Sequence, residues 1–312
     1  MNSAIPSPLP LSEAARKTTI IDAPRLARRL GFELTIATET FQHTGSFKFR
    51  AAYNLASKIP ERKILTASSG NFGQAMAFAC SLLGKSCTIV MPATSAKVKV
   101  DAVREYGGVV DLIDTRAVSR AQRVAELAKE NPDAYVASAY DDLLVIEGNA
   151  SLGAELAALA DDFDAVVAPV GGGGLSSGII KGLRSGGSRA RVVGAEPLLA
   201  NDAARSLREG RIVQNETEVQ TIADGARTVS LGVNNWAVLK AGLSGIVEVP
   251  EENIVEGVRM LFSLANLKAE PTGALAIGAL LTQPKSFSGQ KVCCVVSGGN
   301  VDPAVYRQIL ES

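Results

Sequence analysis

Histidine is nearly absent from this sequence, because His43 is the only one. That count argues strongly against a Ser-His-Asp triad and against a histidine-rich zinc site. Any acid–base chemistry then has to come from lysine, serine, carboxylates or a bound cofactor.

Patterns for disulfides, export and membrane spans are missing as well. The four cysteines include the adjacent pair Cys293 and Cys294, and no CxxC spacing occurs, which argues against a disulfide framework. Residues 1–12 contain prolines but no basic stretch followed by an apolar core, so we do not expect them to form a signal peptide. No apolar run reaches the roughly 18 residues of a membrane span. We expect a cytoplasmic protein.

The charge balance gives no sign of a polyanionic partner. Lys and Arg together number 32, as do Asp and Glu, which argues against nucleic acid or an anionic membrane as the main partner. Aromatic residues are only 5% of the chain against 46% for all hydrophobic residues, so the core must be aliphatic. The length of 312 residues suits one or two α/β domains.

Strand-like and helix-like segments alternate along most of the chain, separated by short loops with glycine or proline. This alternation predicts right-handed βαβ units and a parallel sheet. Residues 11–30 are predicted to form one helix with Ser12 as its N-cap, and residues 201–220 form a weaker, charged region. Further helices are predicted at 47–58, 75–83, 96–106, 116–130, 152–159, 175–184, 238–241 and 252–267, and strands at 33–37, 63–67, 86–91, 109–114, 134–137, 164–170, 191–194 and 291–296.

The most unusual segment is TGSFKFR, residues 44–50, which holds a lysine between two aromatic residues after a glycine turn. Phe47 and Phe49 would lower the local dielectric around Lys48, and Arg50 adds a like charge. Both effects lower the lysine pKa and make its amine a usable nucleophile and base near neutral pH. A helix that starts at Lys48 would add the positive end of its dipole. On these seven residues alone, a lysine that reaches from an apolar surface into solvent is the simpler interpretation.

Four consecutive glycines lie between a predicted buried strand and a predicted helix. Their N–H groups can converge on an anion at a helix N-terminus, which indicates a phosphate site; a plain tight turn would be a costly use of four glycines. No Gly-Lys-Ser/Thr follows, so this is not a Walker loop. The GxGxxG fingerprint is broken too, because serine stands at both positions where its last glycine could lie. The four residues are Gly171, Gly172, Gly173 and Gly174.

Two more strand ends carry polar groups. Residues 68–71, with the sequence SSGN, lead into a helix, and their free N–H groups can bind a substrate carboxylate or simply cap that helix. Residues 297–300, SGGN, end the last predicted strand and are a weak signal by themselves.

These segments together resemble one family. SFKFR at residues 46–50 is similar to the Schiff-base motif of pyridoxal-phosphate enzymes with the tryptophan-synthase β-subunit fold, and within that group to the serine/threonine dehydratases and serine racemases. The likeness extends from about Glu39 to Pro303, and so covers most of the chain. It implies an α/β fold of two three-layer α/β/α domains with mainly parallel sheets. The large pyridoxal-phosphate-binding domain would comprise residues 1–63 and 141–312, and the small domain residues 64–140.

The resemblance also implies a role for each site residue. Lys48 would form the Schiff base with pyridoxal 5'-phosphate and abstract the substrate α-proton, and Ser69 would be the second acid–base group on the opposite face of the ring. Other cofactor contacts would come from Phe47 and Gly225 on the two ring faces, Glu270 near the ring, Asn71 at the phenolic oxygen, Ser297 at a neutral ring nitrogen, and Gly171 to Gly174 at the phosphate. The substrate would meet Ser68, Ser69, Gly70, Asn71 and Phe72.

Residues 196–202 contain a candidate cation site. By spacing alone, Glu196, Ala200 and Asp202 belong to a solvated loop. Glu-Pro-x-x-Ala-x-Asp, however, resembles the divalent-metal loop of the family, in which two carboxylates and one carbonyl bind Mg²⁺ or Ca²⁺.

Two departures from the family pattern bear on the substrate and not on the cofactor. Phe72 stands where relatives usually carry histidine, and residues 148–151 are GNAS in place of the common GQGT. A phenyl ring lacks the donor and acceptor of an imidazole. Phe72 would therefore give a second substrate carboxylate no hydrogen-bond donor, and we predict that hydroxyaspartate is a poor substrate. A bulkier or more apolar β-hydroxy amino acid is expected to compete with serine and threonine.

The function that follows is a β-elimination. We expect a dehydratase (ammonia-lyase) that converts a small β-hydroxy amino acid into a 2-oxo acid and ammonia, in a homodimer of the kind the resemblance implies. An amino-acid racemase that uses Lys48 and Ser69 as opposed bases is the alternative within the family. A nicotinamide-binding module ending at Glu196, and a ligand-binding protein without activity, remain open from other classes.

Overall fold

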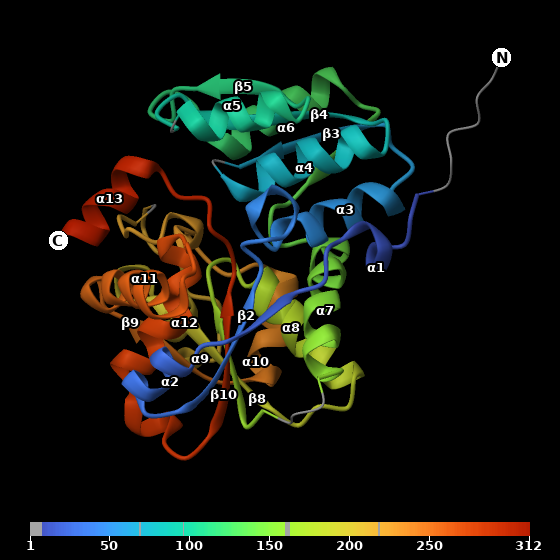
Figure 1. The fold of residues 1–312 in the computed structure, drawn as a ribbon. Helices are drawn as coiled ribbons and strands as arrows, with labels where there is room; N and C mark the ends of the chain where they lie inside the picture. The colour runs from blue at the N-terminus through green and yellow to red at the C-terminus, as the bar shows by residue number, and fades with distance from the viewer. Residues whose placement is uncertain (1–7, 69, 96, 160–162, 218) are drawn as a thin grey trace.

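Two separate sheets organise the chain, and the site described below lies where they approach each other. This computed structural model describes residues 8–68, 70–95, 97–159, 163–217 and 219–312. The six-stranded sheet lies in the lower half of Figure 1 and the four-stranded sheet in the upper half. Every strand predicted from the sequence is present in one of the two sheets.

The larger sheet has the strand order β1-β2-β10-β7-β8-β9, so the last strand of the chain lies in its middle. Only β1 runs antiparallel to its neighbour; all other pairs are parallel. The carboxyl ends of the parallel strands therefore share one edge, where ligands bind in open α/β sheets. The strands are β1 Thr19–Asp22, β2 Glu33–Thr38, β7 Ala165–Pro169, β8 Arg191–Pro197, β9 Leu243–Val249 and β10 Lys291–Val296.

The smaller sheet is wholly parallel, with the order β5-β4-β3-β6. Its strands β3 and β6 lead into the turn at Ser68 and the segment at Ser138, so these two segments emerge from the same edge. The strands are β3 Lys63–Ala67, β4 Ser86–Pro92, β5 Val109–Ile113 and β6 Ala134–Ala137.

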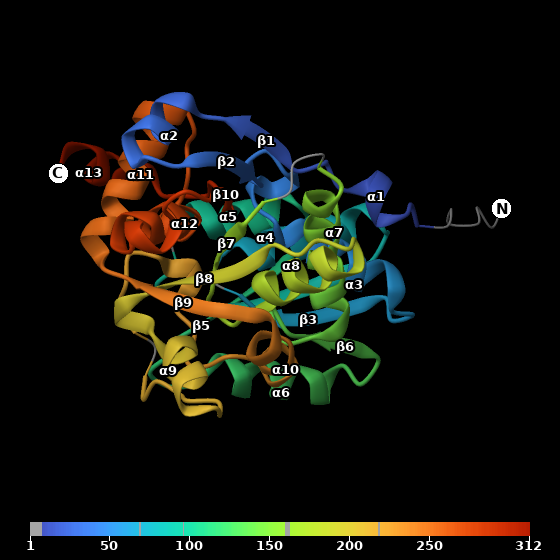
Figure 2. The ribbon, with the colours of Figure 1, turned by 90° about the horizontal axis from the view of Figure 1, so that it is seen from below.

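Helices cover both faces of the larger sheet (Figure 2). On one face α12 packs on four strands and is covered by α11, while α8 packs on the other face beside α7 and α10. The helices are α1 Leu11–Ala14, α2 Pro24–Leu30, α3 Lys48–Lys58, α4 Asn71–Leu82, α5 Lys97–Glu105, α6 Arg120–Glu130, α7 Leu143–Ala157, α8 Gly174–Ser185, α9 Asp202–Glu209, α10 Val233–Gly242, α11 Glu251–Ala265, α12 Pro271–Thr282 and α13 Pro303–Glu311, with short 3-10 turns η1 His43–Gly45, η2 Leu198–Ala200, η3 Asp224–Ala226 and η4 Pro284–Phe287.

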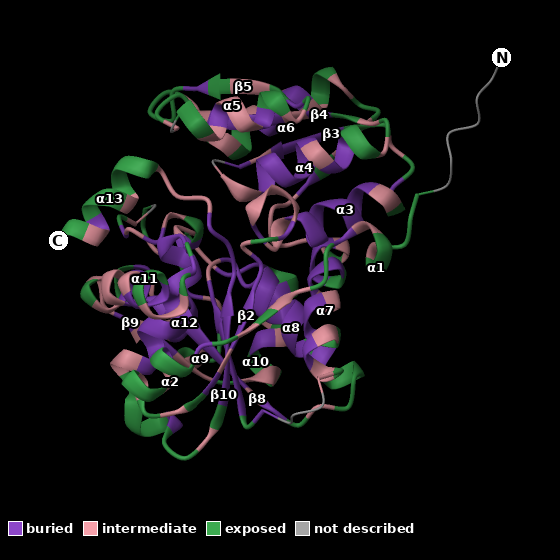
Figure 3. Ribbon diagram, in the orientation of Figure 1, coloured by how far each residue is buried: buried purple, intermediate pink, exposed green. Residues whose placement is uncertain are grey.

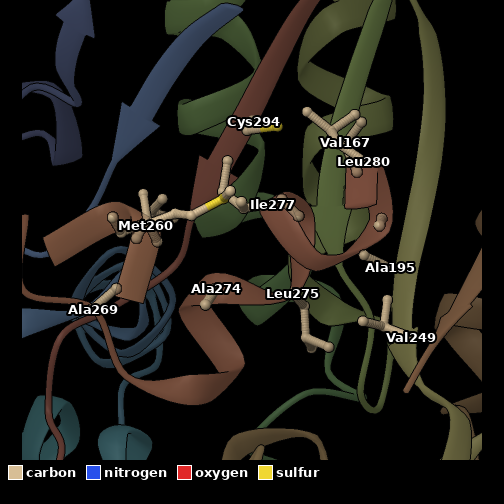
Figure 4. Packing of buried hydrophobic residues seen from close by; sticks show 14 of the residues in the cluster. Val167, Ala195, Val249, Met260, Ala269, Ala274, Leu275, Ile277, Leu280 and Cys294 are labelled. Carbon is tan, nitrogen blue, oxygen red and sulfur yellow. The ribbon is translucent and has the colours of Figure 1, made fainter. Parts of the chain in front are cut away.

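The core is aliphatic, as its composition predicts. Strand β7 is buried along its whole length, β8 and β10 are buried after their first residue, and α12 is buried from Pro271 to Leu280 (Figure 3). Ile277 and Leu280 of α12 belong to one cluster with Met260, Val167 and Cys294 from the surrounding elements (Figure 4). Each fully buried side chain of this size contributes about 1.5–3 kcal/mol by leaving water. Rigid, buried strands thus carry the loops that form the site.

The predicted helix over residues 11–30 is wrong. Thr19–Asp22 is a strand instead, because this β-branched run pairs with β2 at the edge of the larger sheet. Pro24 then occupies the first turn of α2. The N-cap of the short α1 is Pro10 and not Ser12.

Other elements escaped sequence-based prediction, or were predicted too short. No periodicity marks α12, because this helix is buried on all sides. β9 and α13 were also missed, α7 begins nine residues earlier than expected, and the region expected to be weak contains α9.

The domain boundaries at 63/64 and 140/141 stay a prediction. A single hydrophobic cluster joins the smaller sheet to α3 and to Val145 of α7, on the other side of both boundaries. Within the described ranges, no helix is both long and apolar enough to cross a membrane.

Candidate active site

Lys48 is the first residue of α3, and its amine lies between aromatic rings. Its Nζ is 5.1 Å from the ring centre of Phe47 and 5.6 Å from that of Phe72. It donates a hydrogen bond of 2.7 Å to the carbonyl of Ala139. Burial lowers the pKa of Lys48 to about 8, against the charge of Glu270, which raises it. The amine is therefore partly neutral near physiological pH, as a nucleophile and base requires.

Arg50 does not lower the lysine pKa as the sequence suggested. Its buried guanidinium donates to both oxygens of Glu39 and to the carboxylate of Glu155. Burial by itself would lower the pKa of Arg50, but these two carboxylates raise it above its usual range. Because the positive charge is compensated locally, it is not among the causes of the shift at Lys48.

The glycine loop, residues 171–174, joins β7 to α8, as predicted. Its shape requires glycine, because a side chain at these positions would collide with neighbouring atoms. A Cβ at Gly172 would lie 2.2 Å from the ring of Tyr140, and Gly173 has a φ of 95°. Asn235 fixes the loop by donating 2.8 Å to the Gly172 carbonyl. No side chain caps α8, so its first N–H groups remain available to an anion.

Ser297 lies at the end of β10, beside the lysine segment. Its carbonyl accepts a 3.0 Å bond from the N–H of Phe47, and Ser46 forms a bridge with Gly298. The Ser297 hydroxyl is buried and has no hydrogen-bond partner among the described residues. A buried hydroxyl without a partner is costly, so this oxygen is suited to a ligand atom.

The turn before α4 connects the two sheets across the site. The hydroxyl of Ser68 accepts bonds from the N–H groups of Gly70 and Gly73, at 3.3 and 3.0 Å. Asn71 donates 2.8 Å to Glu270. The amide of Asn300 in turn donates 2.8 Å to the side-chain oxygen of Asn71. Ser69 lies outside the described residues.

Glu270 precedes α12 and carries a strongly shifted carboxyl. Burial and then the charge of Asp224 raise its pKa to about 8, against the opposing influence of Lys99, Asn71 and Lys48. A proton on Glu270 near neutral pH leaves no full negative charge facing the amine of Lys48.

Gly225 lies next to the glycine loop, and it is exposed. Its N–H donates 3.0 Å to the hydroxyl of Thr272, and its carbonyl would be 3.2 Å from a Cβ at Gly171. The segment η3 therefore forms a shelf against the loop.

Phe72 takes part in both environments that were considered for it. Its side chain is only 2% exposed and packs in the hydrophobic cluster of the smaller sheet. The same ring is within 5.6 Å of the Lys48 amine. It is thus a core residue that also forms a wall beside the lysine.

Glu196 and Asp202 are not in a solvated loop, because each is 1% exposed. Glu196 accepts the N–H groups of Ala203 and Ala204 at the start of α9, and Asp202 accepts the amide of Asn215. One oxygen of Asp202 is buried and has no partner among the described residues.

Both carboxyls have raised pKa values. Burial raises that of Asp202 to about 6, and burial together with the charge of Asp202 raises that of Glu196. Ala200, also buried, precedes α9 in the short turn η2. In the described part of the chain no three His, Cys, Asp or Glu residues cluster as metal ligands, so a cation here would rely on two carboxylates and a carbonyl.

Sequence reasoning missed several residues that shape the site. The ring of Tyr140 covers Gly172, and Asp141 accepts the first N–H groups of α10 at Val233 and Asn234. Both follow the carboxyl end of β6, and that position is the signal that could have found them.

Comparisons with known proteins agree with this geometry. The family model described as "Pyridoxal-phosphate dependent enzyme" matches residues 11–298. L-threo-3-hydroxyaspartate ammonia-lyase of Pseudomonas sp is 35% identical, over 95% of this chain and 94% of that protein. The T.th. threonine deaminase superposes with a TM-score of 0.89 at 36% identity, over 94% and 95% of the two chains. Maize serine racemase gives a TM-score of 0.90 at 28% identity, over 96% and 93%.

These matches confirm the predicted fold class and overturn the nicotinamide-binding alternative. They extend through the lysine segment, the glycine loop and the end of β10, where the site geometry lies. The chain therefore belongs to the pyridoxal-phosphate dependent enzymes, in the group that contains the serine/threonine dehydratases and serine racemases.

Proposed function

We propose that this protein is an ammonia-lyase that converts a small β-hydroxy amino acid of the serine or threonine type into a 2-oxo acid and ammonia. The observation that carries the proposal is the Lys48 amine, which burial holds at a pKa of about 8 with a backbone carbonyl as its hydrogen-bond acceptor. Such an amine can bind covalently to a carbonyl group and can accept a proton.

The residues present fit pyridoxal phosphate. The glycine loop supplies N–H groups at a helix N-terminus for the phosphate. The buried hydroxyl of Ser297 has no hydrogen-bond partner among the described residues, and the ring nitrogen of the cofactor could be that partner. Glu270, whose charge acts on the Lys48 amine, accepts a hydrogen bond from Asn71, and the ring of Phe47 contacts that amine. When bound, the cofactor withdraws electrons from Cα of the amino acid and so acidifies the α-proton.

Each side chain then has a limited task. Lys48 accepts the α-proton at Nζ. The N–H groups of Ser68 and Gly70 already donate to the Val90 carbonyl and the Ser68 hydroxyl. The substrate carboxylate would therefore be bound by N–H groups at the start of α4, from Asn71 onward. Protonated Glu270 avoids an uncompensated charge beside the amine. Ser69 is proposed as the second acid–base group, on the side opposite Lys48.

Phe72 bears on which β-substituent the substrate carries. The Pseudomonas relative is named for a dicarboxylic substrate. A buried phenyl wall beside Lys48 offers no donor to a second carboxylate. We therefore propose a preference for an apolar β-substituent.

Racemisation is the second candidate function. Its support is the likeness to maize serine racemase along almost the whole chain, and Lys48 and Ser69 as opposed bases would carry it. Chiral chromatography of recovered substrate separates the two functions, because a racemase returns both enantiomers while a lyase consumes one.

The main test is a screen of β-hydroxy amino acids with the cofactor-loaded protein, reading 2-oxo acid and ammonia. We expect turnover and visible cofactor absorbance in the wild type, and loss of both in Lys48→Ala. Lys58→Ala is the matched control, because Lys58 is exposed in the same helix and pairs with Glu147. A Lys48→Ala variant that kept absorbance and turnover would contradict the proposal.

We further propose that Glu196, Asp202 and the carbonyl of Ala200 bind Mg²⁺ or Ca²⁺. Two buried carboxyls with raised pKa values gain from a cation that replaces their protons. Chelator should lower the melting temperature of metal-loaded protein by linkage, and Asp202→Ala should remove that sensitivity. An unchanged melting curve on chelation would exclude the site.

A homodimer and a cytoplasmic location complete the proposal. The dimer rests on the family resemblance, and analytical ultracentrifugation tests it. The location is supported by the four cysteines, all buried and free, as a reducing compartment allows.

A further inference from the structure

One ion pair joins the two halves of the molecule next to the proposed substrate turn. The upper lobe is here the four-stranded sheet with α4, α5 and α6, and the lower lobe is the six-stranded sheet with its helices. Lys99, in α5 of the upper lobe, pairs with the carboxylate of Asp224, in η3 of the lower lobe. The lysine side chain is 15% exposed and that of the aspartate 37%, so water reaches the pair only in part.

Both partners lie at functional segments. A Cβ added at Gly70 would lie 3.7 Å from Nζ of Lys99, so the ammonium group lies beside Gly70, in the turn of residues 68–71 that precedes α4. Asp224 immediately precedes Gly225, whose carbonyl packs on the glycine loop at Gly171. The pair thus connects this turn, which leads into the proposed carboxylate site at the start of α4, to the shelf proposed to face the cofactor.

Two hydrogen bonds cross between the lobes close by, and both involve Asn71. This residue donates to Glu270 and accepts from Asn300. Asn71 is itself a proposed cofactor contact, whereas Lys99 and Asp224 have no such role. The charges of Lys99 and Asp224 both act on the pKa of Glu270, in opposite directions, which places the pair within electrostatic reach of the site.

We propose that Lys99 is a positioning residue, which holds the substrate turn against the lower lobe through its ion pair with Asp224. This inference rests on the proposed function for its effect on substrate, and on the lobe geometry for its effect on the turn. A partly buried pair between two lobes resists their separation more than an exposed pair does. Without it the turn samples positions away from the shelf, so substrate affinity falls while the chemistry at Lys48 is retained.

The kinetic test compares Lys99→Met with Lys97→Met. Lys97 is a matched control, because it lies two residues away in the same helix, is exposed and pairs with Asp101. We expect KM to rise about tenfold in Lys99→Met with kcat changed less than about threefold, and no change in Lys97→Met. Lys99→Arg, and the exchanged pair K99D with D224K, should restore KM to within about threefold of the wild type. Equal KM values in the two Met variants would overturn the proposal, as would an exchanged pair no better than Lys99→Met.

A second measurement needs neither substrate nor cofactor. Amide hydrogen exchange of the apoprotein, followed on peptides covering residues 66–75, should be faster in Lys99→Met than in the wild type or Lys97→Met. An unchanged exchange rate would overturn the positioning role whatever the activity. Faster exchange in a protein that turns over no β-hydroxy amino acid would support the positioning role and reject the proposed function, so the two failures are distinguishable.

Discussion

Lys48 and Arg50 lie two residues apart in the first turn of α3, and their surroundings differ mainly in carboxylates. The amine of Lys48 donates to a backbone carbonyl between two aromatic rings. The guanidinium of Arg50 donates to Glu39 and Glu155, to the hydroxyls of Thr18 and Ser151, and to a backbone carbonyl. Burial alone would lower both pKa values, but only that of Lys48 is lowered, because the two carboxylates raise that of Arg50.

The comparison teaches that burial by itself does not decide the charge state of a cation in this protein. Local carboxylates keep Arg50 charged and useful as a structural tie between the N-terminal segment, α3 and α7. Neither carboxylate is among the causes that shift the pKa of Lys48, so its amine is able to lose a proton. The same helical turn can therefore hold a structural cation beside a reactive one.

Removal of the structural cation should have the largest effect on stability. Arg50→Met leaves Glu39 buried without its partner, so we expect the free energy of unfolding to fall by about 3–5 kcal/mol. Urea denaturation of the apoprotein measures it. The control is Arg116→Met, because the exposed pair of Arg116 with Asp114 contributes little to stability and its loss should leave the urea midpoint almost unchanged. If the two substitutions lowered the free energy of unfolding by similar amounts, Arg50 would not be the structural cation that its carboxylate partners indicate.

Glu270, the carboxyl whose charge acts on the Lys48 amine, gives a pH-dependent prediction. The pKa of Glu270 is about 8 in the folded protein and about 4.3 in an unfolded chain, so only the folded state keeps this proton between those values. The contribution of Glu270 to stability is therefore full below about pH 4.3 and declines as the pH rises to 8. Glu270→Gln should remove that decline in urea denaturation of the apoprotein at pH 5 to 8.

Other groups also bear on this measurement. Asp202, with a pKa raised to about 6, and Glu196, with a pKa also raised by burial, add a decline of the same sign, which the wild type and the mutant share. Lys48 contributes in the opposite sense, and only above pH 8, because its pKa is lowered to about 8 from about 10.4. A mutant as pH-dependent as the wild type between pH 5 and 8 would show that Glu270 is already ionised beside Lys48.

The smallest effect is expected at the apolar wall beside the reactive amine. Phe72→His should raise kcat/KM for hydroxyaspartate relative to phenylserine, because burial of an apolar β-substituent against Phe72 is worth on the order of 1–3 kcal/mol. The measurement is kcat/KM for hydroxyaspartate, phenylserine, serine and threonine in the wild type and in Phe72→His. The idea fails if hydroxyaspartate is the best wild-type substrate or if the ranking is unmoved by the substitution.

Local signals indicated the segments that form the candidate site, because the lysine turn, the four glycines after a buried strand and Ser297 at a strand end are each visible in a few consecutive residues. The structure brings these segments together at the carboxyl edge of the larger sheet, where the N–H of Phe47 donates a hydrogen bond to the carbonyl of Ser297. The second ring beside the Lys48 amine is that of Phe72 and not that of Phe49. Phe49 packs against His43, Tyr53 and Phe78 instead.

Long-range partners could not be predicted in this way. Glu155 is 105 residues from Arg50 in sequence, so the neutralisation of that charge depends on how α3 and α7 pack. The strand at Thr19–Asp22 likewise depends on pairing with β2, and the apolar residues of α12 show no periodicity because every side of the helix is buried.

The most direct test of this account is a ¹³C NMR titration of the Lys48 side chain in the apoprotein, assigned with Lys48→Arg. The account predicts a midpoint near pH 8, because burial disfavours the charged amine and no carboxylate neutralises it as Glu39 and Glu155 neutralise Arg50. A midpoint at the usual lysine value of about 10.4 would contradict it.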